Sequence, residues 1–344
     1  MYIPARSVYT ETWFGAAYVK QWEGDGAMGI GAFVVKRFVG AVLVIIGVTV
    51  LTFFLVHLAP GNPIQASLGQ HASPAEVKVL MHAYGLDQPV INQYFNYVGG
   101  LLHGNLGPSF QHPDQNVNQI LGQGLPITLW LGLWATIVAL VVGVPLGILA
   151  AVRHNKLISD NLNMGANMVL YSVPPLLLIA VARLVFGILP SQNNLPHLPV
   201  TGWQGFTSLS SLVLPVLIYA SGIVGLFARS MRSFMLEVLN QQYIRTARAK
   251  GIAYWKIVFI QAGRNTLVPF ASILGPTVAF LVIGAFVIET IFDIPGIAGI
   301  TVTSTLANDY DVTLATTILL ALAVVVVNAL TDIFYALVDP RVRL

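Results

Sequence analysis

The sequence contains no cysteine and very few charged side chains. The absence of cysteine excludes disulfides, thiol nucleophiles and thiolate metal sites. Only 9% of the residues are Asp, Glu, Lys or Arg, whereas soluble domains usually contain about 25%. Because 56% of the residues are hydrophobic, too few polar groups remain to cover a surface in water. The composition therefore predicts an integral membrane protein.

The sequence also lacks the motifs of the common hydrolytic enzymes. It has no G-x-x-x-x-G-K-[ST] phosphate loop, no G-x-S-x-G turn and no H-E-x-x-H pair. Its seven histidines follow no ligand spacing of a metal site. We therefore predict no catalytic residue, no metal site and no cofactor bound by this chain, so that ATP and magnesium would bind to partner subunits.

Six segments are long enough to cross a membrane, because a spanning helix needs about 20 predominantly apolar residues. Backbone groups in lipid must be satisfied within the segment, which predicts helices, and the long alternating pattern of a β-barrel is missing. The predicted spans are approximately Phe33–Leu58, Leu125–Val152, Met164–Leu189, Leu209–Phe227, Leu267–Ile288 and Val312–Val338.

Basic residues are distributed unequally between the two sets of loops. One set contains Arg153, Lys156 and, near the C-terminus, Arg341 and Arg343, together with seven Lys and Arg residues between positions 229 and 264. The opposite set contains a single base, Lys78. Since basic loops stay in the cytoplasm, we expect both termini to be cytoplasmic and the protein to be a multi-pass protein of the cytoplasmic (inner) membrane of a prokaryote.

The loop that follows the first span is long and contains signals of folded structure. In "SPAEVKVLMHAYGLDQP", Ser73 is in the position of an N-cap, Pro74 follows it, and Glu76 completes a capping box. Gly85 provides a stop signal for this short helix. We therefore expect residues 59–124 to form a folded cap on the outer face.

The basic segment "EVLNQQYIRTARAKGIAYWKIVFIQAGRN" predicts a cytoplasmic amphipathic helix over Leu236–Lys250. Gly251 is expected to end this helix, since glycine accepts the left-handed conformation of a C-cap. The expected apolar stripe consists of Leu236, Leu239, Tyr243 and Ala247. From the residues alone, the segment either anchors to anionic lipid or docks a cytoplasmic partner; nucleic-acid binding does not suit a short loop tethered to a membrane.

The segment "QQYIRTARAKGIAYWKIVFIQAGRNTLVP" resembles the cytoplasmic EAA loop of the membrane subunits of ABC importers. The segments "HLAPGNP", "YGLDQPVINQYFNYVGGLLHGNLGPSF", "LPITLWLGLWATIVALVVGVPLGILAAVR", "VIETIFDIPGIAGI" and "DIFYALVDPRVR" are similar to other parts of the B-type permease of dipeptide, oligopeptide and nickel importers. The sequence departs from the common pattern at Asn62 and Asn105, where Asp is usual, at Arg245 and Thr246, and at Gly263. The resemblance extends from about residue 33 to residue 344.

This resemblance implies a type I importer bundle of six transmembrane helices that forms half of a translocation pore for dipeptides or oligopeptides. The implied partners are a homologous C-type permease, two cytoplasmic ATPases, an extracytoplasmic solute-binding protein and the lipid bilayer, with no nucleic acid. The residues implied to contact the ATPases are Tyr243, Arg245, Thr246, Ala247, Arg248, Ala249, Lys250 and Gly251. Two alternatives stay open: an importer of nickel or another non-peptide solute, and a secondary transporter that works without ATP, although no internal repeat is evident.

The expected organisation has three parts, with the coupling loop at about residues 236–264 in the last of them. Residues 1–32 form an N-terminal cytoplasmic extension, of which Met1–Ala27 lies outside the resemblance, so that Met28 could be the true start. Residues 33–124 contain the first span and the outer loop, and residues 125–344 form the permease core.

Five polar residues in or beside the spans are candidates for the pathway or gate, because ionisable groups in a membrane are costly. They are Arg183, Glu289, Asp293, Asn328 and Asp332. Arg183 either faces the pathway, with Glu289 as a possible partner, or extends to the headgroups. Glu289 either belongs to a gate or lies at the membrane interface, where "IPG" is expected to turn the chain into a short helix. Asn328 and Asp332 share a helix face and form either a structural clamp or a substrate contact.

Overall fold

The computed structural model describes residues 30–69, 72–112, 114–154, 165 and 172–338. The predicted N-terminal extension, the first part of the third predicted span and the bases Arg341 and Arg343 lie outside these residues. Within the described part every regular element is a helix, and the only β-type pairing is an isolated bridge between Pro108 and Asn116. The prediction of an all-α protein is confirmed.

Six helical runs in the described residues are long and apolar enough to cross a membrane, which confirms the predicted number of spans. Three of them contain a π-helical turn. The three uninterrupted runs are α2 (Ile30–Leu58), α11 (Leu209–Leu239) and α16 (Tyr310–Val338). The three runs with a π-helical turn are α6 with η1 and α7 (Val117–Val138, Ala139–Gly143, Val144–Val152), α9 with η2 and α10 (Pro175–Arg183, Leu184–Ile188, Leu189–Gln192), and α13 with η3 and α14 (Tyr254–Lys256, Ile257–Ala262, Gly263–Phe292).

Helix α11 is longer than predicted, because it continues from the expected end at Phe227 to Leu239. The continuation contains two arginines, which is why hydropathy alone does not include it. It is stabilised by a buried stripe at four-residue spacing, formed by Phe227, Met231, Met235 and Leu239. This stripe belongs to the largest hydrophobic core, together with Phe270 of α14. Side chains at this spacing lie on one helix face, so α11 presents a single packed surface that continues to its end at Leu239.

Helices α11 and α14 occupy the centre of the bundle. Helix α11 packs against α6, η1 and α7, and α14 packs against α6, α11, α15 and α16, whereas α2 packs along α16 at the edge. The approach of α7 to α11 depends on Gly147, because a Cβ at this position would lie 2.6 Å from the carbonyl oxygen of Ala228. Small residues allow membrane helices to pack at such short distances.

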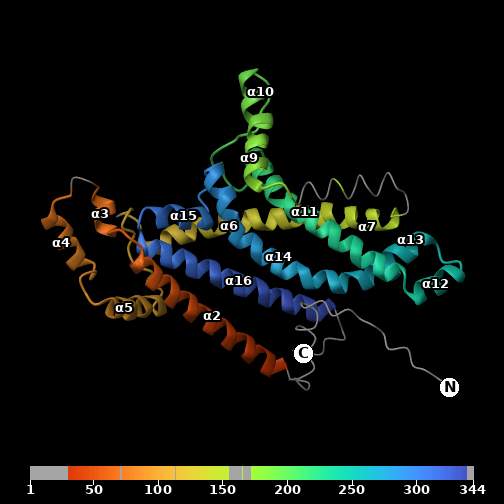
Figure 1. The fold of residues 1–344 in the computed structure, drawn as a ribbon, viewed down its shortest axis with the longest axis horizontal. Helices are drawn as coiled ribbons and strands as arrows, with labels where there is room; N and C mark the ends of the chain where they lie inside the picture. The colour runs from red at the N-terminus through yellow and green to blue at the C-terminus, as the bar shows by residue number, and fades with distance from the viewer. Residues whose placement is uncertain (1–29, 70–71, 113, 155–164, 166–171, 339–344) are drawn as a thin grey trace.

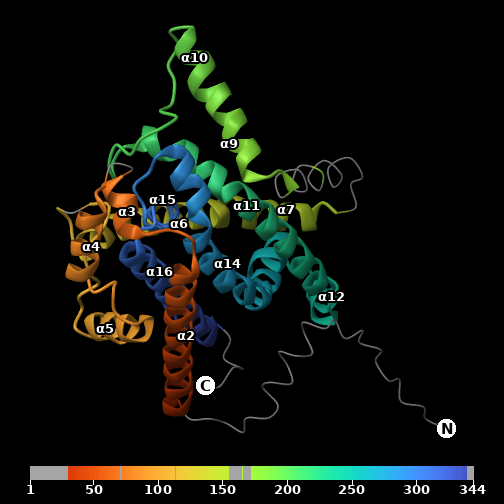
Figure 2. The ribbon, with the colours of Figure 1, turned by 60° about the vertical axis from the view of Figure 1, so that its left-hand side comes forward.

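The loop after α2 forms the predicted cap, with helices α3 (Pro63–Leu68), α4 (Pro74–Ala83) and α5 (Val90–Leu102). The capping box is confirmed: the Ser73 hydroxyl accepts from the amide of Glu76 at 3.2 Å, and the Glu76 carboxylate accepts from the amide of Ser73 at 3.0 Å. The cap and α12 (Gln242–Ala249) lie at opposite ends of the molecule in both ribbon views (Figures 1 and 2). Helices α9 and α10 project from the bundle between them.

Candidate functional site

The predicted continuous helix over Leu236–Lys250 is wrong. Helix α11 ends at Leu239, and α12 begins only at Gln242. Between them Gln241 is extended, with φ −67° and ψ 152°, so the chain turns before the second helix starts. The break separates the arginines of α11 from α12, which makes α12 a distinct eight-residue element at the end of the bundle.

The buried face of α12 also differs from the prediction. Ile244 and Ala247 are buried and belong to the same hydrophobic core as Met235 and Phe270. Tyr243, expected in the stripe, is 43% exposed, and its hydroxyl accepts a hydrogen bond from the side-chain Nδ2 of Asn265 at 2.7 Å. The sequence pattern does not indicate Ile244, because a stripe that continues from α11 does not include the break in the helix before Gln242.

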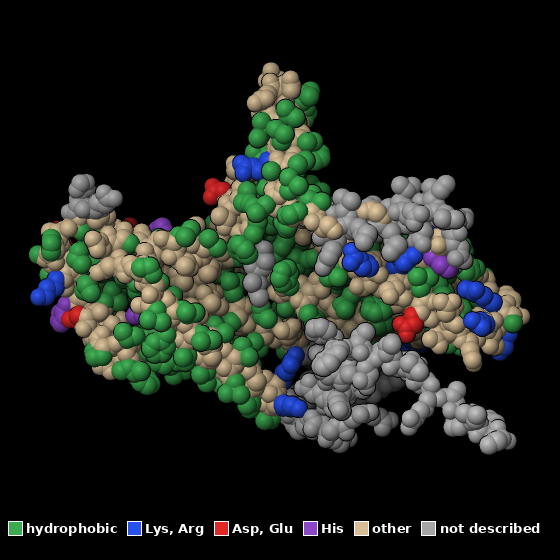
Figure 3. Space-filling view, viewed as in Figure 1, with side chains coloured by type: hydrophobic (Ala, Val, Ile, Leu, Met, Phe, Trp, Pro, Cys, Tyr) green, Lys and Arg blue, Asp and Glu red, His purple; other side chains and the backbone are tan. Residues whose placement is uncertain are grey.

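The opposite face of α12 is exposed and positively charged. Arg245, Arg248 and Lys250 are exposed there, beside the small exposed residues Thr246 and Ala249. The Arg248 guanidinium also lies over the ring of Tyr254, 6.0 Å from its centroid. Figure 3 shows Lys and Arg side chains gathered at this end of the molecule. The predicted coupling residues thus form one continuous exposed surface, apart from Ala247, which faces the bundle.

Gly251 ends α12 as predicted, in a Schellman motif. The amide of Ile252 donates to the carbonyl of Ala247 at 3.2 Å, and the amide of Gly251 donates to the carbonyl of Arg248 at 3.0 Å. This pattern requires a left-handed residue after the helix, and Gly251 has φ +72°. The chain then returns through α13 and η3, whose exposed Trp255 and Phe259 rings stack at 5.7 Å.

Glu289 lies in a buried polar cluster, at the end of α14 nearest the cap. Its carboxylate accepts from the Thr128 hydroxyl at 2.6 Å and from the amide of Gly299 at 2.7 Å, while the Thr128 hydroxyl accepts from the amide of Ile297 at 2.8 Å. The cluster therefore joins α14, α6 and the start of α15 (Ile297–Leu306), which is the predicted short helix after "IPG". The bond to Gly299 satisfies an amide in the first turn of α15, where backbone donors have no partner within the helix.

Glu289 has an exposed fraction of 0%, so its carboxyl group does not contact solvent, and the choice between a gate and a position at the membrane interface stays a prediction. The suggested pair with Arg183 is not formed: among the described residues, the Arg183 guanidinium donates to the carbonyl of Ile291 at 3.4 Å. Asp293 is exposed and ends α14 in the left-handed conformation, with φ +52°. Asn328 is half-buried on α16, and the side chain of Asp332 lies outside the described part, so their clamp stays a prediction.

Another polar cluster, which no local sequence pattern indicates, fastens the cap to the bundle. Asp309, between α15 and α16, accepts from the hydroxyl of Ser109 at 2.5 Å and from the amide of Phe110 at 3.2 Å. Asp309 is only 1% exposed. The two segments are 200 residues apart in the chain, so no local pattern could have paired them.

Beneath the cap lies a cavity of about 210 Å³. Its polar lining includes His57, Gln93, Asn96, Tyr97 and Asp311. Ring nitrogens of His57 lie 2.8 Å from the carbonyl oxygen of Phe53 and 3.1 Å from the side-chain oxygen of Gln93.

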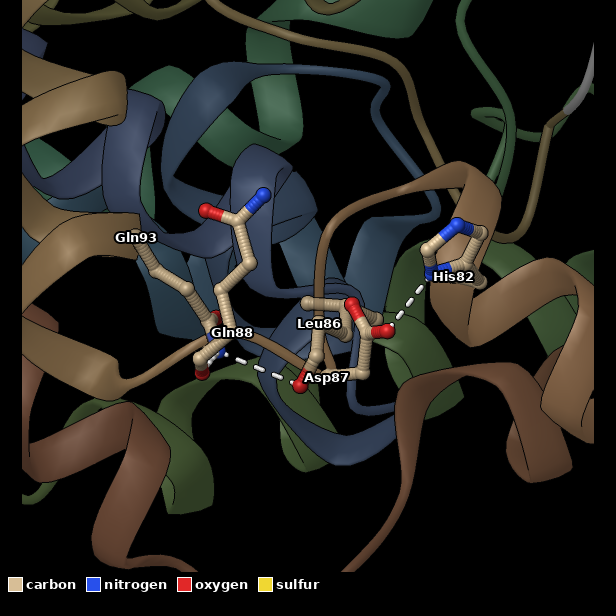
Figure 4. Close-up of polar contacts among 5 residues, drawn as sticks. All are labelled: His82, Leu86, Asp87, Gln88 and Gln93. Carbon is tan, nitrogen blue, oxygen red and sulfur yellow. Dashed lines mark hydrogen bonds and ion pairs between the residues drawn. The ribbon is translucent and has the colours of Figure 1, made fainter.

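The turn between α4 and α5 is held by side-chain contacts (Figure 4). The side-chain Nε2 of Gln93 donates to the backbone carbonyls of Leu86 and Gln88, at 3.2 and 2.8 Å. His82 and Asp87 form an ion pair at 2.7 Å. The hydrogen bond to Asp87 raises the pKa of His82, and the same bond lowers the pKa of Asp87. In the described part of the chain, no three His, Asp or Glu side chains are grouped as ligands for a metal.

Comparison with known proteins places these features in a family context. Residues 143–344 match the model of the binding-protein-dependent transport system inner membrane component, and residues 30–132 match the N-terminal model of such components. The sequence is 36% identical over 312 residues to the oligopeptide transport system permease protein OppB of Haemophilus influenzae, covering 90% of this chain and 99% of that protein. It is also 36% identical to the dipeptide transport system permease protein DppB of Bacillus subtilis, covering 91% and 98%.

The fold resembles that of a solved transporter. A chain of the inward-facing MetNI methionine ABC transporter superposes with a TM-score of 0.53 at 18% identity, covering 64% of this chain and 97% of the other. At this identity the likeness concerns the fold alone, and it confirms the prediction of an ABC importer permease bundle.

Proposed function

Because this chain belongs to the family of binding-protein-dependent transport system inner membrane components, and is thus a multi-pass inner membrane permease, we propose that it forms half of the translocation pathway of an ATP-driven importer of dipeptides or oligopeptides. The proposal is carried by one observation: permeases named for these peptides align with at least 90% of this chain and 98% of their own length. The relation therefore includes the spans, the cap and α12 together.

The proposed partners are a homologous C-type permease, two cytoplasmic ATPases and an extracytoplasmic solute-binding protein. ATP would be hydrolysed on the ATPases, since the sequence contains no phosphate loop. The bases around α12 support a cytoplasmic position for this end of the molecule and for both termini.

The proposed coupling element is α12, and its packing supports this role. Its exposed cationic face is available to an ATPase, while Ile244 and Ala247 are buried in the core that contains Met235 of α11 and Phe270 of α14. Close-packed interiors transmit displacement because they contain few voids. A pull on α12 would therefore move α11 and α14, the two central helices, and so alternate the access of the pathway.

The test is uptake by proteoliposomes that contain this chain with its partner permease and ATPases, supplied with the binding protein outside and ATP inside. We expect uptake of radiolabelled peptide only when ATP is present, with competition by unlabelled peptide. Uptake of radiolabelled nickel that unlabelled peptide does not reduce, without uptake of peptide, would favour the nickel importer. Uptake by this chain alone, driven by an ion gradient, would overturn the proposal.

A further inference from the structure

Helix α5 has two different apolar faces, and the described residues cover one of them. Tyr94 packs against α2, with its ring centroid 5.3 Å from that of Phe53 and 6.0 Å from that of Phe54. Tyr97 lies on the same face, 6.1 Å from Phe53. These contacts fix α5 beside the end of α2 that carries the cap.

The other face of α5 is a stripe of large apolar side chains, formed by Ile91, Phe95 and Leu102. Their exposed fractions are 53%, 66% and 81%. Positions separated by four and by eleven residues fall on one side of a helix with 3.6 residues per turn. A cap surrounded by water would leave this stripe in contact with solvent, which is unfavourable for contiguous apolar surface.

The depth of α5 along α2 indicates what covers the stripe. The bases Lys36 and Arg37 mark one boundary of the hydrocarbon on α2. A helix rises about 1.5 Å per residue, so the hydrocarbon thickness of about 30 Å places the other boundary near His57. Phe53 and Phe54 then lie about one helical turn, roughly 5 Å, inside this boundary.

The surface of α2 beside these contacts is itself apolar. Leu51, Leu55 and Leu58 are exposed, and on a spanning helix such side chains face lipid. Figure 2 shows α5 running across the direction of α2 at this end. The stripe on α5 therefore continues a lipid-facing surface at the depth where amphipathic helices lie, about 5–10 Å into the headgroup boundary.

We infer that α5 is an interfacial helix, with Ile91, Phe95 and Leu102 inserted into the leaflet on the cap side of the membrane. The occupant of the stripe is lipid. This seats the cap on the bilayer as well as on the bundle, so that α5 moves with the membrane surface when α2 and α16 move. In the proposed topology, this leaflet is the outer one.

The absence of native cysteine allows a direct test with one introduced cysteine and an environment-sensitive NBD label. The variants are Phe95→Cys on the stripe, Leu55→Cys as the lipid reference, Lys78→Cys as the water reference in the cap, and Asn92→Cys on the polar side of α5. All four positions are exposed, so labelling should not disturb packing. The labelled full chain is studied with its partner subunits in nanodiscs whose phosphatidylcholine carries a doxyl group near the headgroup or deep in the acyl chain.

We expect quenching of Phe95→Cys by the shallow doxyl lipid that is comparable to that of Leu55→Cys and several-fold stronger than that of Lys78→Cys or Asn92→Cys. Quenching by aqueous iodide instead would overturn the inference, because the stripe would then face water. Protection from both quenchers would also overturn it and would indicate a covering protein. The readout does not depend on transport, so it stays informative if the proposed solute or energy source is wrong.

Discussion

Replacing Gly251 with a series of residues tests whether its role depends on the left-handed backbone conformation or on empty space beside the turn. A Cβ at this position would meet no atom of the described chain within 4 Å, so crowding inside this chain cannot explain an effect. The residue does have φ +72°, and the left-handed conformation costs an ordinary L-residue about 1–2 kcal/mol. Asn visits this region much more readily than other residues, and β-branched residues least.

The size of the effect follows from this conformational cost. A loss of about 1–2 kcal/mol changes an equilibrium ratio about 5–30-fold. Here the equilibrium is between the turn that has the Schellman hydrogen bonds of Ile252 and Gly251 to the end of α12 and a turn without them, so the ratio of the two would fall by this factor. We therefore expect uptake per ATP hydrolysed to be nearly retained in Gly251→Asn, reduced in Gly251→Ala, and most reduced in Gly251→Val.

The assay measures peptide uptake and phosphate release in the same proteoliposomes, so that the ratio reports coupling rather than protein amount. Gln242→Ala is a control, because it changes an exposed residue at the other end of α12 without requiring a positive φ. If Gly251→Asn is as defective as Gly251→Val, the partner requires empty space beside the turn and the conformational argument fails. If all three variants couple normally, α12 is not the coupling element.

Three further predictions concern the bundle and the cap. Glu289→Ala should lower the thermal stability of the purified complex, because the buried donors on Thr128 and at the start of α15 lose their acceptor, at about 1–3 kcal/mol each. Gly147→Leu should destabilise the packing of α7 on α11 by at least about 1–3 kcal/mol, measured as a lower midpoint in a thermal aggregation assay. The pair of His82 and Asp87 should protect their turn from hydrogen exchange in the pH range between the lowered pKa of Asp87 and the raised pKa of His82, and the contribution of His82 should disappear as the pH rises through its raised pKa.

Each of these predictions has a control. Glu289→Gln should cost less than Glu289→Ala, because the side-chain oxygen of glutamine still accepts a hydrogen bond from the donors on Thr128 and at the start of α15. Gly222→Ala should be tolerated, because no atom lies within 4 Å of its added Cβ. His82→Gln should remove the pH dependence of exchange in the turn between α4 and α5. Equal sensitivity of this turn in the variant would show that His82 is not the titrating group.

Features that depend on neighbouring residues could be predicted from the sequence. The six spans follow from runs of apolar residues, the start of α4 follows from the capping box of Ser73 and Glu76, and the end of α12 follows from Gly251. In each case the determining interactions lie within one or two helical turns, or between a segment and its solvent. The tertiary structure does not alter them.

The errors at α11 and α12 show where this reasoning stops. The stripe from Phe227 to Leu239 continues α11 past two arginines because it is buried against other helices, and the extended Gln241 then begins a separate helix. Helix propensity does not contain this information. Ile244 is buried instead of Tyr243 because α12 starts in a new direction after the extended Gln241.

The sequence by itself determined that this chain spans the membrane six times, with a cap at one end and a basic helix at the other, because these properties depend on local hydropathy, charge and turn chemistry. Only the tertiary structure decided that Glu289 is buried and fastens α15 to α6, and that Asp309 binds Ser109 from 200 residues away. The physical reason is that a polar group in a membrane protein is satisfied by whatever donor the fold brings to it, and that donor can lie anywhere in the chain.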